Sequence, residues 1–182
     1  MVVCEWLKTV SLLKSEFTKE IIKPKKLTTT KINCKKVKDK IPAYANGWYT
    51  VERDPNQFAE AAQKVVDKGY IGMKFDPFGN GDLELTRKEF HKSMDLIDAV
   101  AAVAGNRAQI MLELHGRFAP HQAREIANYV EKYEPAWLEE PTRPGDLPAL
   151  KSVRDHTRLP IATGERLYGA PEFRELWSLG CV

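Results

Sequence analysis

Residues 41–182 alternate between two patterns, short apolar runs and longer stretches with helical apolar spacing. The short runs predict buried strands, and the longer stretches predict amphipathic helices. The predicted strands are 41–45, 71–76, 109–115, 136–139 and 161–164. The predicted helices are 55–68, 87–104, 120–130, a short one within 147–157, and 171–179. Strands that alternate with helices in this way predict parallel βα units.

Capping residues set the boundaries of the first two predicted helices. Asp54 is a predicted N-cap with Pro55 at the first helical position, and Gly69 is expected to end that helix. Thr86, followed by Glu89 three residues later, predicts a capping box at the start of the second helix.

The number of predicted units indicates the fold class. Five βα units are followed by 180–182, which looks like the opening of a sixth strand. A closed barrel of this type has eight units and about 250 residues. The prediction is therefore an α/β fold, a partial (β/α)8 TIM barrel of about five βα units. The expected domains are a truncated barrel domain at 41–182 and a poorly defined basic leader at 1–40.

Charge and cysteine content add little to this fold prediction. Residues 1–40 hold 11 lysines and 4 acidic residues, a net +7, so the remainder carries −4 of the overall +3. This leader lacks arginine and has little aromatic interleaving, which argues against nucleic-acid binding. No apolar run approaches a membrane span, and the three scattered cysteines suit reduced thiols. We expect a cytoplasmic protein without membrane or nucleic-acid partners.

Three glutamates recur at equal intervals, since Glu139 lies 26 residues after Glu113 and 26 before Glu165. A strand, a loop and a helix take about that length, so equal spacing places all three at the same end of successive parallel strands. Carboxylates sharing one pocket repel, and Mg²⁺ with its oxygen ligands removes that conflict. The trio predicts a Mg²⁺ site, with surface carboxylates as the alternative. Strand alternation favours Glu139 over Glu140 as ligand, and an ion pair for Glu140.

Five short motifs, taken in order and at their spacing, resemble the enolase superfamily. They are 41–45, 74–79, 113–118, 137–141 and 161–167, and the resemblance covers about 36–182. The chain is most similar to the mandelate racemase and muconate lactonizing group, specifically its galactonate dehydratase-like acid-sugar dehydratases.

The resemblance implies that Glu113, Glu139 and Glu165 ligate Mg²⁺, which grips the carboxylate of a sugar acid such as galactonate. A base then removes the proton from the adjacent carbon, and the metal stabilises the resulting enediolate. The resemblance assigns His115 as the general acid that assists departure of the β-hydroxyl, a role that suits imidazole. A strand-end histidine held by hydrogen bonds is the alternative. The implied activity is a carbon–oxygen lyase of carbohydrate acid catabolism.

Lys74 and Asp76 lie where racemases of this family carry a Lys-x-Lys pair. Because Asp76 replaces the second lysine, a base on this strand is not expected, and Lys74 is expected to assist by neutralising the substrate carboxylate. Arg117 and Arg166 follow two of the ligand positions. They are candidate substrate-binding residues, with the orientation of neighbouring carboxylates as the alternative.

Several family features are not recognisable in this sequence. The family's base is a histidine of strand seven paired with an aspartate of strand six, and its capping domain has no counterpart in 1–40. Many dehydratases of this branch also have aspartate at the position of Glu113. A homo-oligomer or a complementing chain is therefore expected to complete the site. The alternatives are an inactive oligomerisation or binding module, and a racemase or lactonizing enzyme, which Asp76 and His115 disfavour.

Overall fold

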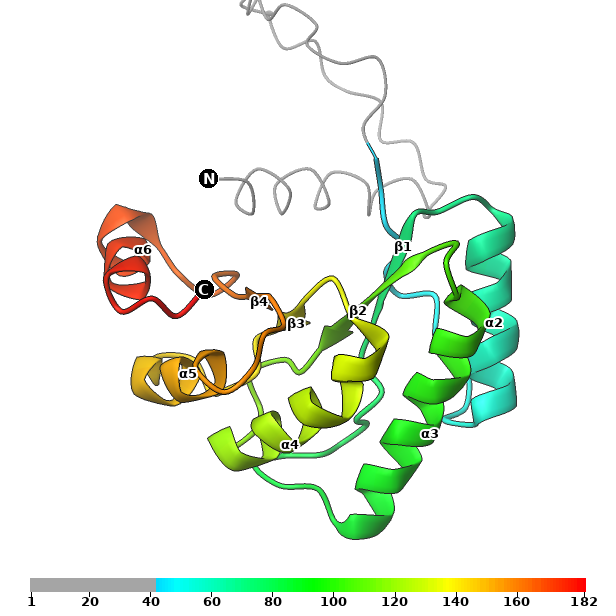
Figure 1. Ribbon diagram of the computed structural model, residues 1–182, viewed down its shortest axis with the longest axis horizontal. Helices are drawn as coiled ribbons and strands as arrows, with labels where there is room; N and C mark the ends of the chain where they lie inside the picture. Colours follow the sequence, from blue (N-terminus) through cyan, green and yellow to red (C-terminus); the bar gives the residue numbers. More distant parts are fainter. Residues whose placement is uncertain (1–41) are drawn as a thin grey trace, which may run out of the picture. The chain divides into compact units, whose positions relative to one another are not determined.

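The computed structural model describes residues 42–182, so the predictions for the leader at 1–40 lie outside the described residues. Residues Ala43–Val182 form one unit in which helices and strands alternate (Figure 1). The elements are α2 Pro55–Asp67, β1 Gly72–Phe75, α3 Arg87–Ala104, β2 Gln109–Glu113, α4 Pro120–Val130, η2 Glu131–Tyr133, β3 Leu138–Glu139, α5 Leu147–Arg154, β4 Ile161–Ala162 and α6 Gly169–Ser178. Within this part of the chain, none of the helices has the length and apolar character that a membrane crossing demands.

The four strands form one parallel sheet in chain order, β1-β2-β3-β4. The register pairs Glu113 directly with Glu139, and Glu139 with Ala162. Ala45 adds a single parallel bridge to Met73 of β1. Figure 1 shows the helices following one another along one side of the strands. Sequential parallel strands with helices between them form part of a barrel wall, so the predicted α/β class and partial TIM barrel are confirmed.

The core lies between the sheet and the helices. Strand side chains such as Phe75, Leu112 and Leu138 are completely buried, which explains why these strands are nearly continuous apolar runs. Ile97 of α3 and Ile126 of α4 are equally buried. Each such side chain stabilises the fold by about 1.5–3 kcal/mol.

The helix caps form largely as predicted. The Asp54 carboxylate accepts hydrogen bonds from two backbone amides in the first turn of α2, and Pro55 is its first residue. Thr86 Oγ1 accepts from the Glu89 amide, 3.2 Å away. The capping box is only half formed, because the Glu89 carboxylate pairs with Arg53 at 2.7 Å instead.

The strand ends differ from their prediction. The predicted strand 41–45 is reduced to the bridge at Ala45 in its described part. The strand ending at Glu113 is shorter than predicted because His115 has a φ of +56°. The strand predicted to reach Gly164 ends at Ala162, since the Gly164 amide donates to the Glu140 side chain rather than to a ladder partner.

The predicted sixth strand at 180–182 does not form. The Gly180 amide donates to the Trp177 carbonyl and the Cys181 amide to the Leu176 carbonyl, so this segment closes the end of α6. Gly180 has a φ of +63°, a left-handed conformation common just after a helix. At its other end, α6 begins at Gly169, two residues before the predicted start.

Candidate functional site

Lys74, Glu113 and Glu139 form a buried charge cluster, called here the Lys74 cluster. Lys74 Nζ lies 2.8 Å from Glu113 Oε2 and 2.5 Å from Glu139 Oε1. The residues come from three adjacent strands and are only 4–7% exposed. Since Lys74 pairs in register with Met111, its side chain shares a face with Glu113 two residues further along β2. The sheet thus brings two of the three predicted ligands together, around a lysine.

The outer oxygens of both carboxylates are also bound. Glu113 Oε1 accepts from the backbone amide of His115 at 2.9 Å. Glu139 Oε2 accepts from Trp137 Nε1, also at 2.9 Å. Tyr44 packs edge-on against the Trp137 indole, with ring centroids 5.7 Å apart. Trp137 therefore orients a predicted ligand. Its position two residues before Glu139, on the same strand face, was the available sequence signal.

One ammonium between two carboxylates leaves the Lys74 cluster with one net negative charge. Burial alone would lower the pKa of Lys74, but the Glu113 and Glu139 carboxylates outweigh it and raise the pKa above its usual value. Burial and the nearby Glu139 carboxylate raise the pKa of Glu113, which Lys74 only partly opposes. The cluster therefore favours additional positive charge.

Glu165 is separate from this cluster. Its carboxylate is 3.3 Å from Arg166 Nη2, and its side chain is 37% exposed. Within residues 42–182, no group of three or more acidic, histidine or cysteine side chains is gathered closely enough to hold a metal ion. The third predicted ligand is therefore not at the end of its strand: it lies in the turn three residues after β4 and contacts an arginine.

Glu140 has the ion pair predicted for it. Its buried carboxylate accepts from Arg166 Nη1 at 2.6 Å, from the Thr163 hydroxyl at 2.6 Å and from the Gly164 amide at 3.0 Å. These contacts join the end of β3 to the segment after β4. Because Arg166 binds both Glu140 and Glu165, its contacts fit the orientation of carboxylates.

His115 follows the end of β2 and turns its side chain towards solvent. Its imidazole is 56% exposed, with Nδ1 3.8 Å from Glu113 Oε1. The left-handed backbone at His115 and Gly116 directs the chain away from the sheet, and the Gly116 amide donates to the Glu140 carbonyl at 2.7 Å. An accessible imidazole thus lies directly beside the Lys74 cluster.

Arg117 is bound within the protein. Its guanidinium donates to both oxygens of Asp76 at 2.8 and 2.7 Å, and to the Gly79 carbonyl at 2.6 Å. Both bonds to Asp76 come from Nη2, and such charge-assisted hydrogen bonds hold the two side chains together. The Asp76 carboxylate is thereby bound to an arginine.

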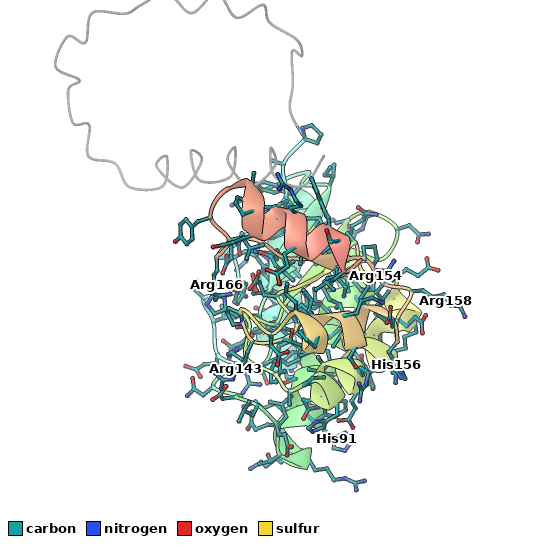
Figure 2. The ribbon with its side chains drawn as sticks, turned by 90° about the vertical axis from the view of Figure 1, so that its left-hand side faces the viewer. His91, Arg143, Arg154, His156, Arg158 and Arg166 are labelled. Carbon is teal, nitrogen blue, oxygen red and sulfur yellow. The ribbon has the colours of Figure 1, made fainter. Side chains whose placement is uncertain are left out.

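Other polar groups lie away from the strand ends. A surface groove of about 560 Å³ is lined by Arg124, Pro148, Lys151, Ser152, Asp155, His156 and Leu179, none of them a predicted site residue. Figure 2 shows Arg166 and Arg143 along one side of the molecule, and His156 with Arg158 along the opposite side. The candidate site is the Lys74 cluster at the strand ends.

The chemistry of the Lys74 cluster fits a hard cation. Two carboxylate oxygens converge on one positive group, and magnesium takes such oxygen ligands. A cation bound by these two carboxylates would lie beside the exposed imidazole of His115. That imidazole suits proton transfer to or from a bound molecule.

The sequence is similar to a known protein family and to named dehydratases. The model of the family described as "Enolase C-terminal domain-like" matches residues 57–182. The D-gluconate dehydratase of Thermoproteus tenax is 42% identical over 137 residues, which are 75% of this chain and 28% of that protein. The D-gluconate/D-galactonate dehydratase of Picrophilus torridus is 32% identical over 140 residues, 77% of this chain and 36% of that protein. The chain thus spans well under half of each relative.

Solved structures share the same backbone arrangement. The crystal structure of mandelate racemase/muconate lactonizing enzyme from Jannaschia sp. CCS1 superposes with a TM-score of 0.70 at 36% identity. The match covers 80% of this chain and 41% of that one.

Proposed function

The chain belongs to the enolase C-terminal domain-like family, and from that premise we propose that its candidate site serves the dehydration of a sugar acid. In the proposed reaction a base takes the proton next to the carboxylate, and the β-hydroxyl accepts a proton and leaves as water. The product tautomerises to a 2-keto-3-deoxy acid. Support comes from relatives named as dehydratases of gluconate and galactonate. The observation that carries the proposal is the convergence of Glu113 and Glu139 on one cationic group.

We assign Glu113, Glu139 and Glu165 as the residues that would hold Mg²⁺. When bound, this ion supplies positive charge that stabilises the negative charge developing on the substrate carboxylate. Glu113 and Glu139 already present oxygens to a common cation, which supports their assignment. Glu165 contacts Arg166, so its use as a ligand requires exchange of that guanidinium for the ion.

His115 is the proposed general acid. Hydrogen bonding of its backbone amide to Glu113 fixes its position, and its exposed imidazole is free to donate a proton to a leaving hydroxyl. Lys74 is proposed to neutralise the substrate carboxylate, for which its raised pKa keeps it charged. Both roles depend on the same strand end, where Glu113 lies next to both residues.

For Arg117 and Arg166, the substrate-binding prediction stays a prediction. Their observed ion pairs with Asp76 and Glu140 support a role in holding carboxylates in place. No residue within 42–182 is assigned as the base in the site of its own copy, and we propose that a residue of a second copy or of a complementing chain supplies it. Light scattering of the purified chain over a concentration series tests this partner, and a monomer at every concentration excludes the second copy.

Calorimetric titration of Mg²⁺ into the purified chain tests the metal assignment. We expect saturable binding that Glu139→Gln abolishes. Glu60→Gln, an exposed carboxylate of α2, is the matched control and should bind like the wild-type chain. Binding that survives Glu139→Gln, or no binding at all, would refute the site.

A product assay tests the reaction. Gluconate and galactonate are incubated with the chain and Mg²⁺, and the 2-keto-3-deoxy acid is quantified. In the assembly that a second copy completes, activity should be lost in His115→Asn and retained in His156→Asn, an exposed histidine just after α5. Turnover that is unaffected by His115→Asn would exclude the general-acid role.

A further inference from the structure

Lys74 contacts the two carboxylate oxygens that face each other in the Lys74 cluster. The other oxygen of each carboxylate is bound by the His115 amide or the Trp137 indole. Each glutamate thus has one oxygen bound by a neutral donor and the other bound by the Lys74 ammonium. The arrangement resembles a cation site in which a side chain supplies the cation.

The sheet register makes such a cation necessary. Glu113 and Glu139 are direct partners on adjacent strands, where side chains lie about 5 Å apart. Two buried carboxylates at that separation repel and would either take up a proton or turn apart. A positive group between them attracts both carboxylates and offsets part of this repulsion.

We propose that Lys74 is a positioning residue, an internal counter-ion that holds Glu113 and Glu139 convergent until a divalent cation enters between them and displaces its ammonium. The proposal rests on the proposed function, which assigns those two carboxylates to Mg²⁺. A divalent ion neutralises both carboxylates, whereas the ammonium leaves one negative charge, so electrostatics favour the exchange. The freed ammonium then lies beside the site, where the proposed substrate carboxylate binds.

The backbone restricts this exchange to the Lys74 side chain. The Lys74 amide donates to the Ala45 carbonyl at 2.8 Å, and its carbonyl accepts from Trp48 Nε1 at 3.0 Å. Both contacts fix the strand on either side of the residue. The flexible four-carbon stem is the part that moves.

Two substitutions of opposite character test the displacement by calorimetry with Mg²⁺. Lys74→Met removes the ammonium at similar length, so no counter-ion has to leave, and Mg²⁺ should bind at least about tenfold more tightly. Lys74→Arg supplies a fork that grips carboxylates bidentately, so Mg²⁺ should bind more weakly than to wild type. Lys64→Met, an exposed lysine of α2, is the control and should leave the affinity unchanged.

Thermal denaturation without divalent ions tests the counter-ion role separately. Lys74→Met should lower the melting temperature, and adding Glu113→Gln to it should recover most of the loss, because a single carboxylate then remains. Mg²⁺ should raise the melting temperature of Lys74→Met more than that of wild type. Should Lys74→Met fail to fold, the Lys74→Arg affinity and the double variant still decide.

The outcomes separate this inference from the proposed function. If wild type binds Mg²⁺ and Lys74→Met binds it equally or more weakly, the displacement is overturned and the metal assignment stands. No Mg²⁺ binding to any variant overturns the metal assignment and the displacement together. A Lys74→Met melting loss that Glu113→Gln does not recover overturns the counter-ion role.

Discussion

Glu140→Gln is the substitution whose effect on stability follows most directly from the structure. The Glu140 carboxylate is 4% exposed and binds Arg166, the Thr163 hydroxyl and the Gly164 amide. Glutamine retains one oxygen, which accepts from one of these donors. The NH₂ group of glutamine takes the place of the other oxygen and cannot accept a hydrogen bond. Either Arg166, or Thr163 together with Gly164, therefore loses its acceptor. The contact that joins β3 to the segment after β4 is thereby broken.

The expected cost is intermediate between those of buried and exposed ion pairs. Breaking a fully buried pair costs about 3–5 kcal/mol. The Arg166 side chain is 34% exposed, so water partly replaces the lost contact. We therefore expect the free energy of unfolding to fall by about 2–3 kcal/mol. For a domain of this size, that change lowers the melting temperature by roughly 4–12 °C.

Urea denaturation monitored by circular dichroism measures this change. Asp155→Asn is the matched control, since Asp155 pairs with Lys151 but both side chains are well exposed, and it should cost under about 0.5 kcal/mol. A double-mutant cycle with Arg166→Met should give a coupling of at least about 1 kcal/mol. A Glu140→Gln effect no larger than that of Asp155→Asn would show that the pair does not join the two strand ends.

Four further substitutions test the fold by denaturation. Leu112→Ala removes a completely buried side chain of β2 and should lower the free energy of unfolding by about 3 kcal/mol, and a loss under about 1 kcal/mol would contradict the place of Leu112 in the core. Asp54→Ala removes the α2 cap and should lower the free energy of unfolding by about 1 kcal/mol, and an unchanged stability would show that Asp54 does not act as a cap. Gly79→Ala should cost about 1–2 kcal/mol, because φ is +59° and the new Cβ would lie 2.7 Å from Arg53 Nη1. Hydrogen bonding to Arg53 holds the pKa of Glu89 below its usual value, so this pair stabilises the fold above the unfolded pKa and loses that effect as the pH falls through the lowered one. Glu89→Gln should therefore reduce the difference in stability between neutral and acidic pH, and an unchanged difference would contradict this.

The helices were predicted better than the strands because helix signals are local. Asp54 and Thr86 each cap the helix that they precede, and the residues needed to see this lie within three positions. Strand ends depend on contacts with other strands. The Gly164 amide leaves the ladder for the Glu140 carboxylate, which lies 24 residues away. The family resemblance is confirmed by the match over residues 57–182, a range that holds four of the five ordered motifs.

The candidate site was predicted in part for the same reason. Equal spacing correctly indicated that Glu113 and Glu139 end adjacent parallel strands, because it depends only on the length of a βα unit. The sequence indicates nothing of Lys74 bridging them, since the contact with Glu139 spans 65 residues. Nor does spacing determine side-chain direction, and Glu165 contacts its neighbour Arg166 instead.

The loops that follow the strands add a second set of links between the same strand ends. Leu83 after β1 bridges Phe118 after β2, and Phe118 in turn bridges Thr142 after β3. Phe78 packs edge-on against Phe118 with ring centroids 5.2 Å apart. The strands that carry Lys74, Glu113 and Glu139 are therefore joined to one another both within the sheet and through the loops that follow them. Since all of these contacts arise within residues 42–182, Mg²⁺ affinity measured on this chain reports on the convergence of the two carboxylates together with the displacement of the Lys74 ammonium.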